Sequence, residues 1–173
     1  MSPLEASRAW VERVVVGLGL CPFASQPLME ERVRFALCES VEPQDVLQAL
    51  AEEIAWLDAA EGPQTTLLVL ARGMTSFDRF LDLVGAAEAL VEALDKSQVY
   101  QLAHFHPNYC FEGVEPDDAV NLTNRSPFPM LHLLRCTDVA AAIDEHPDTD
   151  QIPIRNVERL RVVGLEGVRA LLR

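Results

Sequence analysis

The chain has 173 residues, of which 49% are hydrophobic and 24% are charged, a composition that excludes a disordered or fibrous chain and suits one globular domain over residues 1–173. Its 27 acidic and 14 basic residues give a formal net charge of −13. An acidic chain of this kind lacks the positive charge that attracts nucleic acid or an anionic membrane, so we expect neither as a partner.

Helical and strand patterns alternate along the chain. Apolar residues at helical spacing, with candidate caps at Ser76 and Thr137, predict helices over residues 3–16, 43–57, 77–94, 137–146, 156–161 and 165–172. Alternating or continuous apolar runs predict strands over residues 32–39, 65–71, 99–106 and 129–136. The nearly unbroken apolar run of 65–71 is typical of a central strand that is buried on both faces.

This order of elements predicts an α/β or α+β domain. We expect a roughly four-stranded mixed sheet packed against helices, with further helices at the amino and carboxyl ends. The pattern leaves the strand order open. The apolar helix at 77–94 would suit the interface of a homodimer, although burial in the core explains its composition equally well.

The amino end and the four cysteines indicate a cytoplasmic protein. Residues 1–13 mix charged and apolar side chains and do not resemble a signal peptide, and no stretch reaches the roughly 20 apolar residues that span a membrane. Cys21, Cys38, Cys110 and Cys136 form no CxxC pair, so we expect free thiols in a reducing compartment. Lys96, the single lysine, follows a helix and is predicted to be solvated, which argues against phosphate-loop, kinase and Schiff-base chemistry.

Three histidines mark the most chemically promising segment. His104 and His106 stand two residues apart on a predicted strand and therefore project from one face of the sheet. If the strand at 129–136 pairs beside it, His132 could join them, because neighbouring strands lie about 4.8 Å apart. Three imidazoles would suit a divalent metal such as zinc or iron, with oxygen ligands from Glu112, Glu115, Asp117 or Asp118.

Two other interpretations of these histidines remain open. A metal-free site could use His104, His106 or His132 as a catalytic acid or base. Alternatively, each histidine is a half-buried side chain that hydrogen-bonds to the backbone. An HxH pair alone does not decide between the three.

A second group of candidate residues lies in the long connection between the last two predicted strands. Arg125 offers a rigid fork that can bind a carboxylate or phosphate, and neutral donors stand beside it; the predicted anion-binding residues are Asn121, Asn124, Arg125 and Ser126. The structural alternative is that Arg125 pairs with Asp117 or Asp118 and only fixes the loop.

Three strings of the chain resemble the signatures of an uncharacterised bacterial family. They are Leu20 to Ala24 (LCPFA), Phe105 to Tyr109 (FHPNY) and Asn121 to Arg135 (NLTNRSPFPMLHLLR). The family is catalogued as a domain of unknown function, and the resemblance covers essentially the whole chain. It implies a small cytoplasmic bacterial protein and assigns no activity, cofactor or catalytic residue.

These residues support three functional hypotheses and do not decide whether the protein is an enzyme. The leading hypothesis is an enzyme that acts on a small anionic metabolite, with the histidines as catalytic or metal-binding groups and Arg125 as the anion-binding group. The second is a non-catalytic module that binds a small molecule, a cofactor or a partner. The third is a thiol-dependent redox protein that uses Cys21 or Cys110.

Overall fold

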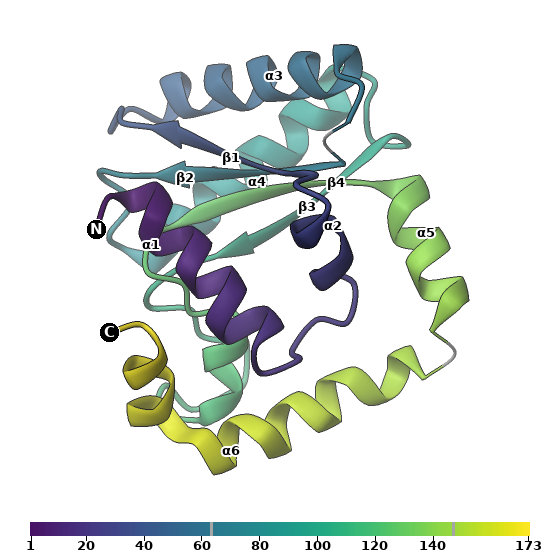
Figure 1. Ribbon diagram of the computed structural model, residues 1–173. Coiled ribbons are helices and arrows are strands. Elements are labelled where there is room, and N and C mark those ends of the chain that lie inside the picture. Colours follow the sequence, from purple (N-terminus) through teal and green to yellow (C-terminus); the bar gives the residue numbers. More distant parts are fainter. Residues whose placement is uncertain (63, 147) are drawn as a thin grey trace.

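The structure is a computed structural model that describes residues 1–62, 64–146 and 148–173; Pro63 and Pro147 lie outside the described residues. Figure 1 shows the arrangement of the elements. The strands are β1 (Val33–Cys38), β2 (Thr65–Leu70), β3 (Tyr100–Phe105) and β4 (Met130–Arg135). The helices are α1 (Pro3–Trp10), α2 (Ser25–Met29), α3 (Pro43–Ala59), α4 (Phe77–Ala93), α5 (Cys136–Glu145) and α6 (Ile152–Leu171). Short helical segments of other types are η1 (Val11–Val16), η2 (Ala119–Thr123) and η3 (Thr149–Gln151).

The strands form one mixed sheet in the order β1-β2-β4-β3. β1 and β2 run parallel, whereas β4 runs antiparallel to both of its neighbours, β2 and β3. The carboxyl ends of β1, β2 and β3 therefore share one edge of the sheet, on the left of Figure 1. The predicted mixed four-stranded sheet with helices at both ends is confirmed.

Helices cover both faces of the sheet (Figure 1). On one face α3 and α4 build a core with Leu68 and Leu70 of β2, and on the other α1 and α6 build a second core with Leu67 and Val69. All residues of β2 are buried, as predicted for the central strand. Since a fully buried leucine or valine contributes about 1.5–3 kcal/mol, the two cores are the main source of stability.

The ends of the helices follow from local sequence. In α1, the Ser2 hydroxyl accepts a hydrogen bond from the Glu5 amide, and the Ser2 amide donates to the Glu5 carboxylate at 2.7 Å, which forms a capping box. Ser76 caps α4 as predicted, since its hydroxyl accepts a hydrogen bond from the Arg79 amide. Gly164, with φ of 65°, interrupts α6 at the predicted break.

Some boundaries differ from the prediction. α5 begins at Cys136 with Arg135 in the N-cap position, so Thr137 is not its cap. α6 begins at Ile152, before the predicted start at residue 156, because Pro153 is well suited to the first turn of a helix. The long connection contains η2, which the Asp118 carboxylate caps by accepting a hydrogen bond from the Val120 amide.

The apolar helix predicted at 77–94 is α4, whose apolar stripe packs in the first core through Phe80, Leu83, Val84, Ala87 and Val91. Burial within the chain therefore explains its composition. Among the described helices, none combines the length and hydropathy that a membrane span needs.

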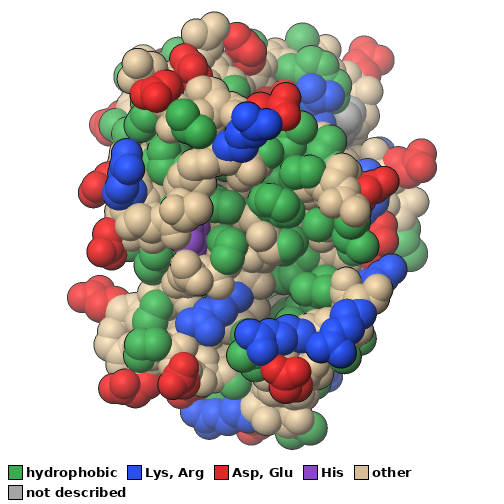
Figure 2. Space-filling model, turned by 90° about the vertical axis from the view of Figure 1, so that its left-hand side faces the viewer, with side chains coloured by type: hydrophobic (Ala, Val, Ile, Leu, Met, Phe, Trp, Pro, Cys, Tyr) green, Lys and Arg blue, Asp and Glu red, His purple; other side chains and the backbone are tan. Residues whose placement is uncertain are grey.

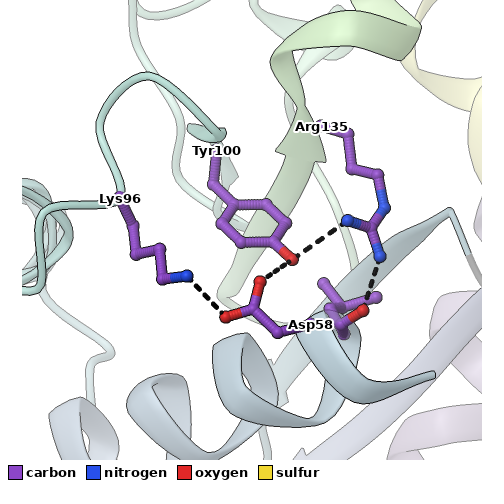
Figure 3. A network of polar contacts seen from close by, with 5 residues as sticks. Asp58, Lys96, Tyr100 and Arg135 are labelled. Atoms are coloured by element: carbon purple, nitrogen blue, oxygen red, sulfur yellow. Dashed lines mark hydrogen bonds and ion pairs between the residues drawn. The ribbon is translucent and has the colours of Figure 1, made fainter.

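A network of charged and polar side chains joins α3 to the sheet at the edge away from the carboxyl ends of β1 to β3 (Figure 3). The Tyr100 hydroxyl donates to Asp58 Oδ1 at 2.8 Å, and Lys96 Nζ lies 2.7 Å from Asp58 Oδ2. The Arg135 guanidinium donates to the Tyr100 hydroxyl at 3.2 Å and to the Leu57 carbonyl at 2.5 Å. Lys96 is therefore part of an ion pair and is not the freely solvated residue that the sequence predicts.

The network shifts the pKa values of its members. Lys96 and the Tyr100 hydroxyl lower the pKa of Asp58, which stays ionised. Burial, together with the Asp58 carboxylate, raises the pKa of Tyr100 to about 12, so its hydroxyl stays protonated and can donate to Asp58.

Replacing Tyr100 with phenylalanine tests this network. We expect Tyr100→Phe to lower the free energy of unfolding at pH 7 by about 1–2 kcal/mol, because it removes hydrogen bonds to two charged groups. The raised pKa adds stability below pH 10 that is lost as the pH rises towards 12, so the difference between wild type and variant should shrink over that range. Urea unfolding at pH 7 and above pH 10 measures both effects, and equal stability at pH 7 would contradict the role of the network.

Candidate functional site

The candidate site lies at the edge of the sheet where β1, β2 and β3 end. The connections 39–42, 71–76 and 106–129 begin there, and the last carries most of the predicted site residues. Ligands of open sheets with parallel strands bind beyond the carboxyl ends of the strands. Figure 2 shows this side of the molecule: hydrophobic side chains gather near its middle, basic and acidic side chains lie around them, and part of a histidine is visible between its neighbours.

His106 is fully buried just after β3, and both of its ring nitrogens have partners. Nε2 donates to the Met74 carbonyl at 2.8 Å, and Nδ1 accepts a hydrogen bond from the Asn108 amide at 3.0 Å. Burial lowers the pKa of His106, which favours this neutral form. His106 thus ties the connection before α4 to the end of β3, and a catalytic or metal-binding role would require the loss of one of these bonds.

His104 lies on the same side of the sheet as His106, as their spacing predicts, since both rings lie beside Phe80. Its half-buried imidazole stacks on Tyr109, with 5.5 Å between the ring centroids. Nδ1 is buried and has no hydrogen-bond partner among the residues described. Burial lowers the pKa of His104, and the Glu88 carboxylate acts in the opposite direction.

His132 lies on the other face of the sheet, so the expected convergence of three imidazoles is wrong. β4 does pair with β3, but in this register Leu131 lies opposite His104 and Ala103 lies opposite His132. Because successive residues of a strand point to opposite faces, the His132 ring projects into the second core beside Phe105.

The environment of His132 fixes its protonation. The Thr65 hydroxyl donates to the Leu133 carbonyl at 2.5 Å and lies 2.6 Å from Nε2 of His132, so Nε2 carries the proton of the neutral ring. Burial lowers the pKa of His132 to about 4. This histidine is a structural side chain at neutral pH.

The arrangement does not fit the predicted zinc or iron site. Within residues 1–62, 64–146 and 148–173, no three or more His, Cys, Asp and Glu side chains come together as metal ligands. His104 and His106 share a side of the sheet, but His106 uses both ring nitrogens and His132 is on the far face. Of the predicted oxygen ligands, Asp118 caps η2 and lies 3.7 Å from Arg161.

Arg125 is fixed by main-chain carbonyls and not by the predicted acidic residues. Its Nε donates to the Tyr109 carbonyl at 2.9 Å and its Nη2 to the Pro116 carbonyl at 2.7 Å. Within the described residues neither Asp117 nor Asp118 pairs with Arg125, although Arg125 does fix the loop, as the structural alternative expects. Two N–H groups of the guanidinium hold the connection together, and its Nη1 has no partner among the described residues.

The neutral residues near Arg125 differ in how much hydrogen-bonding capacity they retain. Asn121 is fully buried; its side chain accepts a hydrogen bond from the Phe111 amide and donates one to the Glu115 carbonyl. The Ser126 hydroxyl is also buried and donates to the Phe128 carbonyl at 2.5 Å. Asn124 donates from Nδ2 to the His104 carbonyl at 3.3 Å and is only half-buried. Asn121 and Ser126 hold the loop in shape, whereas Asn124 bonds to the main chain of His104 and directly precedes Arg125 in the sequence.

Tyr109 is a member of the site that the sequence did not identify. Its ring stacks on His104 and its carbonyl receives the Arg125 hydrogen bond, so it connects the two candidates. Burial raises its pKa, with an opposing effect from the Asn124 side chain. Tyr109 belongs to the FHPNY string, which the sequence analysis singles out as a family signature. No periodicity in the sequence predicts that the chain turns back and stacks Tyr109 on His104.

The cysteines give little support to thiol chemistry. Cys21 is half-buried, and burial raises its pKa, which favours the unreactive thiol over the thiolate. The Cys110 thiol lies within hydrogen-bonding range of the Val114 carbonyl, at 3.3 Å. No disulfide joins the four cysteines.

Comparison with known proteins identifies the family. A family described as protein of unknown function (DUF1415) matches residues 3–170, and the chain belongs to it. A search of curated proteins found no match, and neither did a search of solved structures. The geometry of the site therefore carries the functional argument.

Truncating His106 tests its structural role. We expect His106→Ala to lower the free energy of unfolding by about 2–4 kcal/mol, since it leaves a cavity and two main-chain groups without partners. His104→Ala should cost distinctly less, because its half-buried ring makes no such bonds. Urea unfolding of both variants gives the comparison, and equal losses would contradict the assignment.

The acid stability of the protein tests the placement of His132. A pKa lowered from 6.5 to about 4 gives stability that is complete above pH 6.5 and is lost as the pH falls towards 4. His132→Gln should therefore lower stability at pH 7 and flatten its decline between pH 6.5 and 4. Unfolding curves at several pH values measure the slope; an unchanged slope would show that His132 titrates normally.

Proposed function

We propose that the protein is an enzyme that acts on a small anionic molecule at the carboxyl-end edge of its sheet, with His104 as the acid–base group and Arg125 as the anion-binding group. One observation carries the proposal. Among the three histidines of the segment, His104 is the one whose ring makes no hydrogen bond within the described residues, although its Nδ1 is buried.

The state of His104 suits proton transfer. Burial lowers its pKa below the ordinary value of 6.5, so at neutral pH the ring is unprotonated and can accept a proton from a bound molecule. Stacking on Tyr109 fixes the orientation of the ring. Without a hydrogen bond to Nδ1, neither tautomer is locked, and either nitrogen can carry the proton.

The state of Arg125 suits the binding of an anion. Its bonds to the Tyr109 and Pro116 carbonyls hold the guanidinium in place before a ligand arrives. Such preorganised donors favour an anion more strongly than a mobile side chain does, because they need no reordering. Tyr109 contacts His104 through its ring and Arg125 through its main-chain carbonyl, so one residue connects the acid–base group to the anion-binding group.

The proposal includes neither a metal nor a thiol. The geometry that would bring three imidazoles together is absent from the described residues, and the Cys21 thiol is disfavoured as a nucleophile. Asn121, Ser126 and His106, which the sequence placed in the site, act on it indirectly by holding the connection in shape.

A screen with two matched variants tests this function. Small carboxylates and phosphate monoesters would be incubated with the wild type, and their conversion followed by mass spectrometry. For a substrate so found, we expect His104→Gln to reduce kcat by about 100-fold or more with KM little changed. His132→Gln, which alters a histidine on the far face, should retain kcat once its folding is verified.

Arg125 has a separate prediction. Arg125→Lys keeps the charge but loses the fork, so we expect an increase in KM of about 10-fold or more with a smaller change in kcat. Thermal unfolding checks that the connection remains folded.

Equal kcat values for the His104 and His132 variants would overturn the catalytic role of His104. Saturable binding of a compound without conversion of any compound would favour the non-catalytic alternative.

A further inference from the structure

A cavity of about 160 Å³ lies between the start of α6 and residues 17–24, the loop that joins η1 to α2. Its lining consists of Gly19, Pro22, Ile152, Arg155, Asn156 and Arg159. The four residues from α6 follow the spacing i, i+3, i+4 and i+7 and so occupy one face of its first two turns. In Figure 1 this end of α6 lies on the right, away from the carboxyl ends of β1 to β3.

Side chains of the lining also fasten the loop to the helix. Asn156 is buried, with 7% of its surface exposed, and its Nδ2 donates to the Leu20 carbonyl at 2.7 Å. Arg159 donates from Nη1 to the Leu18 carbonyl. These bonds position the Arg159 guanidinium at the cavity and leave its Nε and Nη2 groups for another acceptor.

Gly19 allows the close approach of Arg159. Its φ of +61° is the left-handed conformation that glycine adopts without strain, and a Cβ at this position would lie 2.7 Å from Arg159 Nη1. Any other residue would push the guanidinium away. The loop therefore has a shape that accommodates a charged group against its main chain.

The charge of the cavity is unusual for this chain. Arg155 and Arg159 both line it, and no carboxylate is among the described lining residues, although the net charge of the chain is −13. Neither arginine forms an ion pair in the part of the chain that the structure describes. Two guanidinium forks and the positive end of a long helix favour an anion, and two positive charges match a phosphate dianion.

We propose that this cavity binds a phosphate group. Its volume is below the 300–1,000 Å³ or so of sites for drug-sized ligands, which suits a single tetrahedral oxyanion and not a large organic molecule. The inference gives a role to the LCPFA segment, whose Pro22 lines the cavity. It is independent of the proposed function, because it involves neither His104 nor Arg125.

The test is a titration with inorganic phosphate at constant ionic strength, followed by calorimetry and by thermal unfolding. We expect saturable binding and a rise in Tm. Arg155→Gln, which removes a side chain without intramolecular partners in the described residues, should weaken binding by about 10-fold or more. Arg161→Gln makes the same change of charge outside the lining of the cavity and should leave Kd within about 2-fold.

A second pair of variants tests the shape of the loop. Gly19→Ala and Gly113→Ala both place a Cβ at a positive φ, but only the first brings it against Arg159, since nothing lies within 4 Å at Gly113. We expect the positive φ to cost both variants a similar amount of stability, and we expect Gly19→Ala alone to lose phosphate binding.

A parallel titration with methyl phosphate identifies the source of the phosphate group. Tighter binding of the monoester would indicate a phosphorylated organic ligand, and binding of inorganic phosphate alone would indicate the free ion. Absence of saturable binding of both probes, or equal affinity in the Arg155 and Arg161 variants, would overturn the proposal.

Discussion

Ala103 lies opposite His132 in the ladder between β3 and β4, and this register determines what the candidate site can be. A shift of one residue would turn His132 to the face of His104, and it would also take Met130 out of the second core and Arg135 away from its partners Tyr100 and Leu57. The apolar residues of β4, which are divided between two cores, oppose such a shift. The packing of the sheet therefore separates the histidines and leaves His104 without an imidazole partner.

The long connection 106–129 shows how a loop without a hydrophobic core of its own keeps one shape. His106, Asn121, Ser126 and Arg125 all form hydrogen bonds with main-chain groups, and each satisfies groups that would otherwise lack partners. Side chains used in this way are no longer free for a ligand. The His104 ring and part of the Arg125 guanidinium remain free for a ligand. The candidate site is therefore smaller than the set of residues that the sequence predicts.

Much of the fold could be predicted because its signals are local. The apolar run at 65–71 identifies a strand buried on both faces, and Ser76 indicates the start of α4. The register between strands and the partners of Arg125 are not local properties. Arg159 and the Leu18 carbonyl are 141 residues apart in sequence, and no pattern in the chain predicts that α6 returns to that loop.

The proposed chemistry requires that His104 be the histidine that is free to react. The most direct measurement is the ¹⁵N chemical shifts of the imidazoles, recorded with and without a substrate that the conversion screen identifies. We expect the chemical shifts of the His104 nitrogens to change on binding, while His106 and His132 keep fixed Nε2–H tautomers. An unchanged His104, or a His132 that responds in its place, would contradict the proposed chemistry.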